Sequence, residues 1–357
     1  RARYQGYLAA VMVTSSVFGP VVGGYLTHHF GWRSIFLINL PLGLAAVLLT
    51  LRLPQRPQRV QDWSFDGMGL VLFIAFIVPA LLALHQAQGV STDRLPLLLA
   101  LAAGGIVTLV LLVRHERRAT FPLFPLHLLR QPPIWRSDGL AACHGAALVS
   151  LVTFLPLYLH VAQATSAAES GLLLLPLMFG IGAGSMTTGR IVSRTGYTTI
   201  FPSVGLILAT TALLCLSLLL SSLTRTELAV LLFCNGLFMG TVMGVVQVTV
   251  QSAAGSASLG SAAASVQLSR AIGAAFGTAL VGTVLFAVLA WTNAETARLF
   301  AAVVQQGPDV LAALPAARQG QVHAEIIAAF RAAFLVIAAF TATGVLLAWS
   351  IPARRLS

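Results

Sequence analysis

Two ionisable side chains lie inside long apolar segments of the chain, where they could do chemistry. His144 titrates near neutral pH and could relay a proton, or it could simply hydrogen-bond to a neighbouring helix. Arg270 could bind an anionic group or stabilise the charged form of a nearby carboxylate. Alternatively, its long side chain reaches the surface of a membrane. Because an ionised group within a membrane is costly, both residues are candidates for a substrate or proton path.

Amide side chains interrupt apolar segments of the same kind at five positions: Asn39, Asn235, Gln247, Gln251 and Gln267. Such groups hydrogen-bond across helices in membranes or line a polar path. Gln247 and Gln251 share one helix face with Met243, because residues four apart lie above one another. This face could contact an amphiphilic ligand, and an ordinary contact between helices remains the alternative.

Acidic residues are too sparse in the apolar segments to form a catalytic pair. Asp66 and Asp138 each stand where an apolar segment begins, and we interpret them as helix caps, since a carboxylate suits the positive end of the helix dipole. His28 and His29 are interpreted as part of a solvated turn. The chain contains no lysine and therefore no phosphate-binding loop of the G-x-x-x-x-G-K-S/T type. These features argue against an enzyme and against ATP-driven transport.

The composition is that of a membrane protein. Of the 357 residues, 57% are hydrophobic and 9% are charged, whereas a soluble domain carries about 25% charged residues. Apolar runs of about 20 residues, the length that crosses a bilayer as a helix, recur along the whole chain. The runs are too long and too uniformly apolar for a β-barrel. We therefore predict an all-α polytopic membrane protein.

Ten membrane-spanning helices are predicted. They cover residues 4–27, 32–51, 66–85, 95–113, 138–160, 170–188, 199–221, 228–250, 264–290 and 328–350. All 21 basic residues are arginines; with both chain ends in the cytoplasm, 14 lie in cytoplasmic segments and six in outer segments, Arg270 being counted with neither. This split supports an even number of spans and cytoplasmic ends, because positive charge gathers on that side of membrane proteins. The net charge of +11 is therefore explained by the orientation of the chain in the membrane, and we predict no nucleic acid partner.

Two connectors differ from the short loops between the other spans. Residues 114–137 form the longest cytoplasmic connector, rich in Arg and Pro, and we predict a boundary between two helical bundles there. Residues 291–327 form a long outer loop, whose segment AETARLFAAVV could be a short amphipathic helix at the interface. Three cysteines lie within apolar runs without metal-ligand spacing and are interpreted as unpaired core residues: Cys143, Cys215 and Cys234.

Glycine and proline cluster in the first predicted span, in SSVFGPVVGGYL. Ser15, Gly19 and Gly23 are spaced by four residues, so one helix face carries almost no side chains and another helix can approach it closely. Pro20 removes a backbone donor and bends the helix, and Gly24 completes the cluster. A plain packing site is the alternative to a functional one.

The sixth predicted span repeats this chemistry in PLMFGIGAGSMTTG, where Pro176 precedes Gly180 and Gly184. We expect the two glycine faces to be partners across the interface between the bundles. A smooth interface of this kind can slide or rock, which a transporter needs and a static anchor does not.

Five segments together resemble one family. SSVFGPVVGGYL resembles the antiporter motif G-x-x-x-G-P-x-x-G-G in the fifth helix of the major facilitator superfamily, with Ser15 in place of the first glycine. HFGWRSIFLINLPLG and FLPLYLHVAQATSAAESGLLLLPL are similar to segments of its fourteen-helix drug:proton antiporters. LGSAAASVQLSRAIGAAFGTALVG resembles their arginine-bearing helix near the C-terminus, here with Arg270. GRIVSRTGY resembles the second copy of a cytoplasmic loop motif, at Gly189, Arg190, Arg194 and Gly196.

The resemblance spans nearly all of residues 1–350 and implies major facilitator-type helical bundles. Ten spans are four fewer than fourteen, so we expect the chain to start just before the fifth helix, without the helices that carry the proton-coupling residues. The implied parts are the last two helices of the N-terminal bundle (1–52), two linking helices (53–113), a cytoplasmic linker (114–137) and the six-helix C-terminal bundle with its outer loop (138–357).

The resemblance also implies a function: a multidrug efflux transporter of the bacterial inner membrane, which exports amphiphilic small molecules in exchange for protons by alternating access. No cofactor is implied besides the proton gradient, and the partners are the lipid bilayer and a small amphiphilic substrate. No residue pattern bears on a periplasmic adaptor, which stays open as a partner. Two alternatives stay open as well: a carrier of the same fold for a siderophore or metabolite, and a transport-incompetent fragment.

The expected position of this chain within a longer protein can be checked on the coding DNA upstream of Arg1. Four more apolar segments, with an acidic residue in the first, are expected in its translation, because the resemblance places proton coupling there. A start codon immediately before Arg1 would favour the fragment instead.

Overall fold

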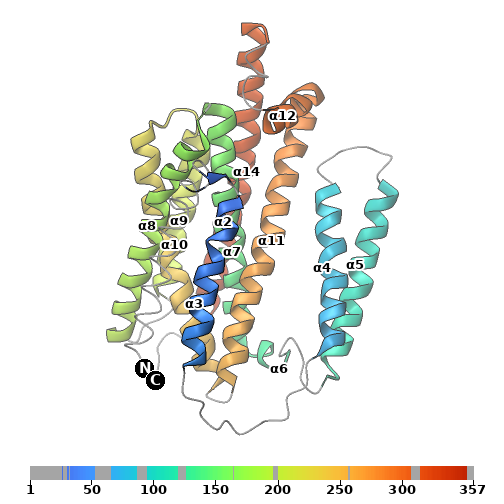
Figure 1. The fold of residues 1–357 in the computed structure, drawn as a ribbon, viewed down its shortest axis with the longest axis vertical. Helices are drawn as coiled ribbons and strands as arrows, with labels where there is room; N and C mark the ends of the chain where they lie inside the picture. Colours follow the sequence, from blue (N-terminus) through green and yellow to red (C-terminus); the bar gives the residue numbers. More distant parts are fainter. Residues whose placement is uncertain are drawn as a thin grey trace.

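Helices make up the secondary structure of the part of the chain that the computed structural model describes (Figure 1). The described residues are Leu26, Phe30, Gly31 and residues 33–52, 66–86, 95–119, 126–163, 165–195, 200–255, 258–306 and 314–351. No strand occurs within them, and the predicted all-α class is confirmed. The first predicted span, residues 4–27, lies outside the described residues apart from Leu26.

The helices in chain order are α2 (Arg33–Leu37), α3 (Asn39–Leu51), α4 (Gly67–Gln86), α5 (Leu95–Glu116), α6 (Leu126–Leu129), α7 (Pro132–Gln163), α8 (Ala167–Thr195), α9 (Ile200–Leu219), α10 (Arg225–Ala254), α11 (Leu259–Thr292), α12 (Ala294–Gln306) and α14 (Ala316–Ser350). Nine segments of the described residues are long and apolar enough to cross a membrane: α4, α5, α7 to α11, α14, and α2 with α3 taken together. Each coincides with one of the last nine spans predicted from the sequence.

Several helices extend beyond the apolar runs that predicted them. α8 follows Ser166, which forms a capping box with Glu169: each side chain accepts a hydrogen bond from the backbone N–H of the other, at 3.1 and 3.2 Å. Thr224 and Glu227 form a second capping box at the start of α10. Polar residues therefore occupy the ends of these helices, where a search for apolar runs does not detect them.

Six helices, α7 to α11 and α14, pack into one bundle (Figure 1). The most extensive contacts join α8 to α10 and α7 to α11, and α14 packs on both α7 and α9. α7 begins at the end of the bundle that lies at the bottom of Figure 1, here named the lower end, and α12 lies at the opposite, upper end. The division of the chain into four parts, as predicted from the sequence, stays a prediction.

α4 and α5 form an antiparallel pair beside this bundle (Figure 1). α4 contacts α11 through Thr283, whose Oγ1 donates a hydrogen bond to the Leu84 carbonyl oxygen at 3.0 Å. The rings of Phe76 and Phe276 stack across the same contact, with centroids 6.3 Å apart. The pair is thus attached to the bundle through α4, while α5 packs on α4.

An aromatic cluster holds α12 against the upper part of the bundle. Phe300 of α12 and Phe330 of α14 are fully buried, with ring centroids 6.0 Å apart, and the ring of Tyr158 on α7 lies 5.3 Å from that of Phe330. The Tyr158 hydroxyl donates to the Leu220 carbonyl oxygen at 2.8 Å, so this buried polar group is satisfied. α12 presents an apolar face to the bundle, so an amphipathic helix forms here as predicted, and its position at the membrane interface stays a prediction.

Glycines allow α8 and α10 to touch backbone to backbone. Gly180 and Gly184 of α8 lie so close to α10 that a Cβ atom on either would collide with a backbone carbonyl oxygen of α10. Gly236 and Gly240 of α10 lie equally close to carbonyl oxygens of α8. These four residues, the α8–α10 glycine contact, form the kind of close approach that small residues permit between membrane helices.

This contact corrects the prediction that Gly180 and Gly184 meet the first predicted span across the bundle interface. α10 already occupies the face that carries the two glycines. The prediction failed because a bare helix face specifies a close approach but not the partner. The matching pair Gly236 and Gly240, also spaced by four residues, is the feature of the sequence that would have indicated α10.

Gly240→Ala is expected to destabilise the bundle by about 1–3 kcal/mol, the usual cost of overfilling a closely packed contact. The new Cβ would collide with the Ile181 carbonyl oxygen, and a helix backbone cannot move aside as a flexible side chain can. Gly244→Ala, four residues further along α10, is the matched control, because no atom lies within 4 Å of its Cβ position. If both variants unfold at the same temperature in detergent, α8 and α10 do not approach each other as closely as the α8–α10 glycine contact requires.

Candidate functional site

Asp66 caps α4, as predicted from the sequence. Its Oδ1 accepts a hydrogen bond from the Gly69 backbone N–H at 2.7 Å. The same oxygen lies 2.8 Å from Nε2 of His115, near the end of α5, so this carboxylate also joins α4 to α5 at the lower end. The second partner is 49 residues away in the sequence, and no local pattern indicates it.

Asp138 is not a helix cap, contrary to the prediction. α7 already begins at Pro132, a residue type suited to the first turn of a helix because its missing N–H would have no partner there. Asp138 therefore lies inside the helix and is 4% exposed. Its Oδ1 lies 3.4 Å from Oγ of Ser265 on α11. The prediction failed because Pro132, Pro133, Arg136 and Ser137 interrupt the apolar pattern while the helix continues through them.

His144 lies about two turns further along α7 and is 3% exposed. Its Nε2 is 3.2 Å from the Met239 carbonyl oxygen of α10, so this nitrogen carries the hydrogen and donates it. This is the contact with a neighbouring helix that the sequence left as one of two alternatives. Nδ1 is buried as well and has no hydrogen-bond partner among the described residues. A role for His144 as a proton relay stays a prediction.

Arg270 lies on α11 where this helix approaches α7. Its side chain is half-buried, and Nε donates to Oε1 of Gln267 on the same helix at 3.3 Å. The backbone at Arg270 lies against Gly145 of α7, where a Cβ would collide with the Arg270 carbonyl oxygen. Because Gly145 follows His144 directly, the two ionisable candidates lie at the same depth on facing helices.

Small residues line the rest of the contact between α7 and α11. Gly273 lies against the backbone of Ala142, and Gly277 lies against Ala146. We refer to these four residues and Gly145 as the small-residue contact. Both helices carry their small residues at a spacing of three or four, so the contact follows one face of each helix over slightly more than one turn.

The amide side chains do not gather into one site. Asn235 is buried and donates from Nδ2 to a backbone carbonyl oxygen of α9 at 3.2 Å. Gln247 and Gln251 are half-buried on the lower half of α10, and Oε1 of Gln247 has no hydrogen-bond partner among the described residues. Asn39 is exposed on α3 and donates to a carbonyl oxygen of its own segment at 3.2 Å. Their place in a substrate path stays a prediction.

The predicted cytoplasmic loop motif is largely helical. Gly189, Arg190 and Arg194 belong to the last two turns of α8, which ends at Thr195, and all three are exposed. The expectation of a loop is wrong here, because the helix continues past its apolar run into a basic segment that suits the negative end of the helix dipole. Outside the described residues lie Gly196 and the antiporter motif: Ser15, Gly19, Pro20, Gly23 and Gly24.

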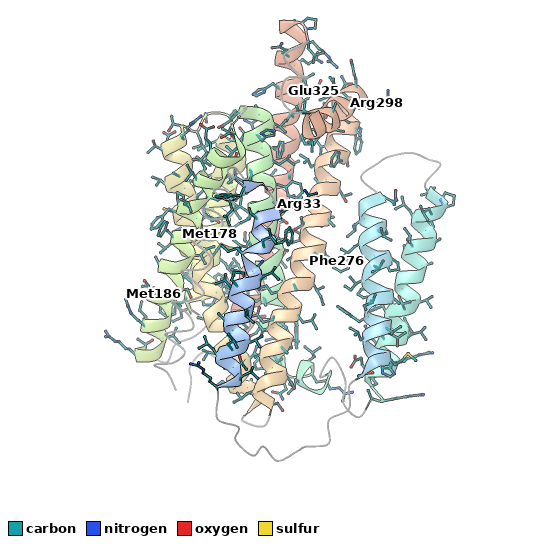
Figure 2. All side chains as sticks on the ribbon, viewed as in Figure 1. Arg33, Met178, Met186, Phe276, Arg298 and Glu325 are labelled. Atoms are coloured by element: carbon teal, nitrogen blue, oxygen red, sulfur yellow. The ribbon has the colours of Figure 1, made fainter. Side chains whose placement is uncertain are left out.

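An open groove that the sequence did not indicate lies between α4, α7 and α11. Its volume is about 550 Å³, and apolar residues such as Leu81, Phe154 and Ala275 line it together with the hydroxyl group of Thr278. Phe276, whose ring stacks on Phe76, lies on the side of α11 that faces α4 (Figure 2). A mostly apolar groove with a single hydroxyl group suits a lipid chain or the apolar part of an amphiphilic molecule.

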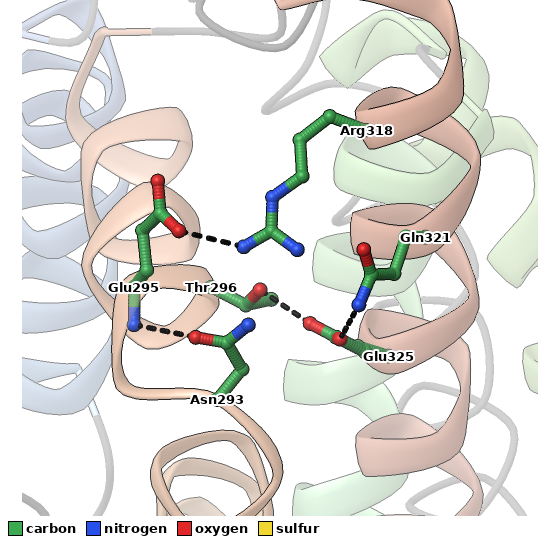
Figure 3. A network of polar contacts seen from close by, with 6 residues as sticks. All are labelled: Asn293, Glu295, Thr296, Arg318, Gln321 and Glu325. Atoms are coloured by element: carbon green, nitrogen blue, oxygen red, sulfur yellow. Dashed lines mark hydrogen bonds and ion pairs between the residues drawn. The ribbon is translucent and has the colours of Figure 1, made fainter.

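A polar network ties helices together at the upper end, where α12 meets α14 (Figure 3). Thr296 of α12 donates to one oxygen of the Glu325 carboxylate on α14, and Gln321 donates to the other at 3.1 Å. Glu295 of α12 forms an ion pair with Arg318 of α14 at 2.8 Å. Together with the aromatic cluster beneath it, this network fixes α12 on α14.

Within the described ranges, no three His, Cys, Asp or Glu side chains come together as ligands for a metal ion. The three cysteines are half-buried and unpaired. The chemistry available beside the small-residue contact is therefore hydrogen bonding, charge and proton binding, from Asp138, His144 and Arg270.

The family model of the Major Facilitator Superfamily matches residues 1–278, which is more than half of the 357 residues. The chain therefore belongs to the Major Facilitator Superfamily. The resemblance stated from its motifs, including the likeness to drug efflux transporters, is confirmed by relatives that carry such names.

Curated relatives of the chain are named as transporters. An uncharacterized MFS-type transporter of Mycobacterium tuberculosis is 31% identical over 217 residues, which cover 61% of this chain and 32% of the relative. The multidrug transporter protein MdtP of Bacillus subtilis is 30% identical, with 55% and 36% covered. The tetracenomycin C resistance and export protein of Streptomyces glaucescens is 32% identical, with 54% and 36% covered. The matched parts amount to roughly a third of the length of these relatives.

Solved structures show the same fold. The inward-facing, occupied crystal structure of a bacterial homolog to the human lysosomal transporter Spinster has a TM-score of 0.54 with this chain at 17% identity. The alignment covers 97% of this chain and 68% of that one. At this level of identity the likeness concerns the fold alone, and it confirms helical bundles of the major facilitator type.

Thr296→Val is expected to lower the free energy of unfolding by about 2 kcal/mol, because it removes a fully buried donor from the Glu325 carboxylate. Glu295→Gln on the same helix is the comparison: it breaks the ion pair of the exposed Glu295 with the half-buried Arg318, worth about 1 kcal/mol. Denaturant titration of the purified protein in detergent measures both. Equal losses would show that the buried hydrogen bond does not hold α12 on α14.

Proposed function

We propose that the protein acts as a secondary active transporter that exports amphiphilic small molecules in exchange for protons. The observation that carries this proposal is membership of the Major Facilitator Superfamily, with relatives named as a multidrug transporter and as a resistance and export protein. The described helices support it, since they can cross a membrane and hold few polar groups at depth. An amphiphilic substrate needs few such groups, because apolar contacts supply most of its binding.

Alternating access would move this bundle relative to the second bundle of the transporter. In secondary transporters, two bundles rock around a central site that opens to one side and then to the other. The α8–α10 glycine contact is a dense, backbone-to-backbone contact, which favours the movement of α8 and α10 as a unit. The proposed path runs beside His144 and Arg270, and includes the amides of α10. The antiporter motif around Gly19 and Pro20 would lie at the interface with the other bundle.

The proton gradient is the proposed source of energy. The chain has no phosphate-binding loop, so ATP is not expected to act on it, and this mechanism needs no cofactor. No chemical conversion of the substrate is part of the proposal. The partners are the lipid bilayer and the small amphiphilic substrate.

We place the protein in the bacterial inner membrane with the lower end of the bundle in the cytoplasm. Arg190 and Arg194 lie at the lower end of α8, and Arg136 lies in the first turns of α7 at the same end. Their position agrees with the enrichment of arginine on the cytoplasmic side of membrane proteins.

A second candidate is a carrier for an anionic siderophore or metabolite. Arg270 supports it, because no ion pair between this half-buried guanidinium and a carboxylate occurs in the described part of the chain. A guanidinium without a protein counter-ion is suited to bind a carboxylate or phosphate group of a cargo.

Efflux of ethidium from cells that express the natural-length protein tests the leading proposal. Efflux is expected to exceed that of cells without the protein and to stop when an uncoupler collapses the proton gradient. Depletion of ATP with the gradient maintained should leave it unchanged. Efflux that continues without the gradient would contradict proton coupling.

Arg270→Gln is expected to slow ethidium efflux by about tenfold or more, which corresponds to about 1.4 kcal/mol of activation free energy, because it removes the positive charge beside His144. Arg298→Gln is the matched control, since Arg298 is exposed on α12 at the upper end (Figure 2). If Arg270→Gln leaves ethidium efflux unchanged, Arg270 has no part in the proposed path, and a loss of transport of an anionic siderophore in the same variant would support the second candidate.

A further inference from the structure

Asp138 is a buried carboxyl group to which the proposed function has so far assigned no role. It lies inside α7 near the lower end of the bundle, with 4% of its surface exposed. Its Oδ2 is buried and has no hydrogen-bond partner among the described residues, and the same holds for the hydroxyl group of the adjacent Ser137. Buried polar atoms normally have a hydrogen-bond partner, so the side chains of Ser137 and Asp138 require an explanation.

The geometry around Ser265 supports a proton on Asp138. Oγ of Ser265 lies 3.0 Å from the Ala262 carbonyl oxygen and 3.4 Å from Oδ1 of Asp138. A hydroxyl group has one hydrogen to donate, and a carbonyl oxygen can only accept. Ser265 therefore donates its hydrogen mainly to the nearer acceptor, the Ala262 carbonyl oxygen. The hydrogen bond from Ser265 to Asp138 is therefore a weak one, because its Oγ–Oδ1 distance of 3.4 Å is long for a hydrogen bond between two oxygen atoms. Ser265 thus gives an ionised Asp138 little compensation for its burial, and this weak hydrogen bond is the one that Asp138 Oδ1 accepts from a side chain among the described residues.

No ion pair with Asp138 occurs in the described part of the chain. The titratable or charged residues on and beside α7 at this end, and on the facing helix α11, are His127, Arg130, Arg136, Cys143, His144 and Arg270. Arg136 donates to the Ser350 carbonyl oxygen of α14, and Arg270 donates to Gln267. The lower halves of α10 and α14, which also pack on α7, carry no ionisable residue.

Burial without a counter-ion favours the neutral acid over the carboxylate. A charged side chain in the interior of a membrane protein costs several kcal/mol unless it is paired or hydrated. Protonation removes this cost while α7 and α11 are in contact. Entry of water at the lower end would restore hydration of the carboxylate and reverse the preference.

We propose that Asp138 is a proton-binding site of the transport cycle, which holds a proton while α7 and α11 are in contact at the lower end and releases it when they separate there. The inference rests on the proposed function, because this proton would be one exchanged for substrate. In the release step the O–H bond of the carboxyl group breaks, a water molecule takes the proton and the carboxylate remains. With the lower end in the cytoplasm, release occurs on the side to which an exporter delivers protons.

The small-residue contact makes such a separation possible. Gly273 and Ala142 meet one turn above Asp138, without side chains that interlock between the helices. At Gly273 no side chain of α11 projects between the helices, so separation at this point requires no change of rotamer there. Arg270, further along the same contact, would then stabilise the newly formed carboxylate through its positive charge.

Infrared difference spectroscopy tests the protonation without any substrate. The purified natural-length protein in lipid is expected to show, at neutral pH, a carboxylic acid C=O band that is absent in Asp138→Asn. Glu295→Gln removes a largely exposed carboxylate at the upper end and should keep the band. Ser265→Ala should shift it, because the acid loses its hydrogen-bond partner. If Asp138→Asn removes a carboxylate band instead, the proposal is overturned.

Transport of ethidium into proteoliposomes tests the release of the proton from Asp138. In Asp138→Asn, exchange of ethidium at equal concentrations on both sides is expected to continue, whereas its acceleration by an imposed pH gradient should fall about tenfold or more. Unchanged acceleration would overturn the proposal. If the unmodified protein moves no ethidium at all, the proposed function fails, and the infrared band still decides whether Asp138 holds a proton.

Asp138→Glu provides a second test in case Asp138→Asn does not fold. Asn has the shape of a protonated Asp, so Asp138→Asn is expected to unfold at the same temperature as the unmodified protein. Should it misfold, Asp138→Glu keeps the acid, and both a shifted carboxylic acid band and the acceleration by a pH gradient are expected. The absence of that band in a folded Asp138→Glu protein would contradict a proton-binding site on this face of α7.

Discussion

Helices inside a bilayer gain no hydrophobic free energy when they touch, because lipid chains are as apolar as the side chains they replace. Close approach of backbones must therefore supply much of the attraction. In this protein glycine makes that approach possible in two places, between α8 and α10 and between α7 and α11. The other helices of the bundle are arranged around these two pairs, with α14 packed on α7 and α9.

The same contacts determine where the few polar groups lie. Gly145, which follows His144 directly, allows the backbone of Arg270 to lie against α7. The Met239 carbonyl oxygen of α10 accepts a hydrogen bond from His144. Further down, Asp138 meets Ser265 on the same pair of helices. Tight backbone packing leaves the side chains of His144 and Asp138 little freedom to find further hydrogen-bond partners. Among the described residues, Nδ1 of His144 and Oδ2 of Asp138 have no such partner.

The two ends of the bundle are held by different interactions. At the upper end, α12 is fixed on α14 by the aromatic cluster around Phe330 and by the hydrogen bonds of Glu325. At the lower end, the contact of α7 with α11 rests on small residues and on the hydroxyl group of Ser265. At the upper end, buried hydrogen bonds therefore add to the attraction that close helix packing supplies, whereas at the lower end the packing of small residues supplies most of it.

The sequence by itself determined the class, the nine described spans and the superfamily, because long apolar runs have one stable structure in a membrane and the Gly-Pro motifs are specific. It also identified the cap at Asp66 and the amphipathic helix α12, which depend on local patterns. Tertiary structure alone decided that Gly180 and Gly184 pack on α10 and that Asp138 is buried against α11 rather than capping a helix. Both outcomes depend on which helix lies opposite, and that choice is made by shape complementarity between residues far apart in the chain, which a local pattern does not contain.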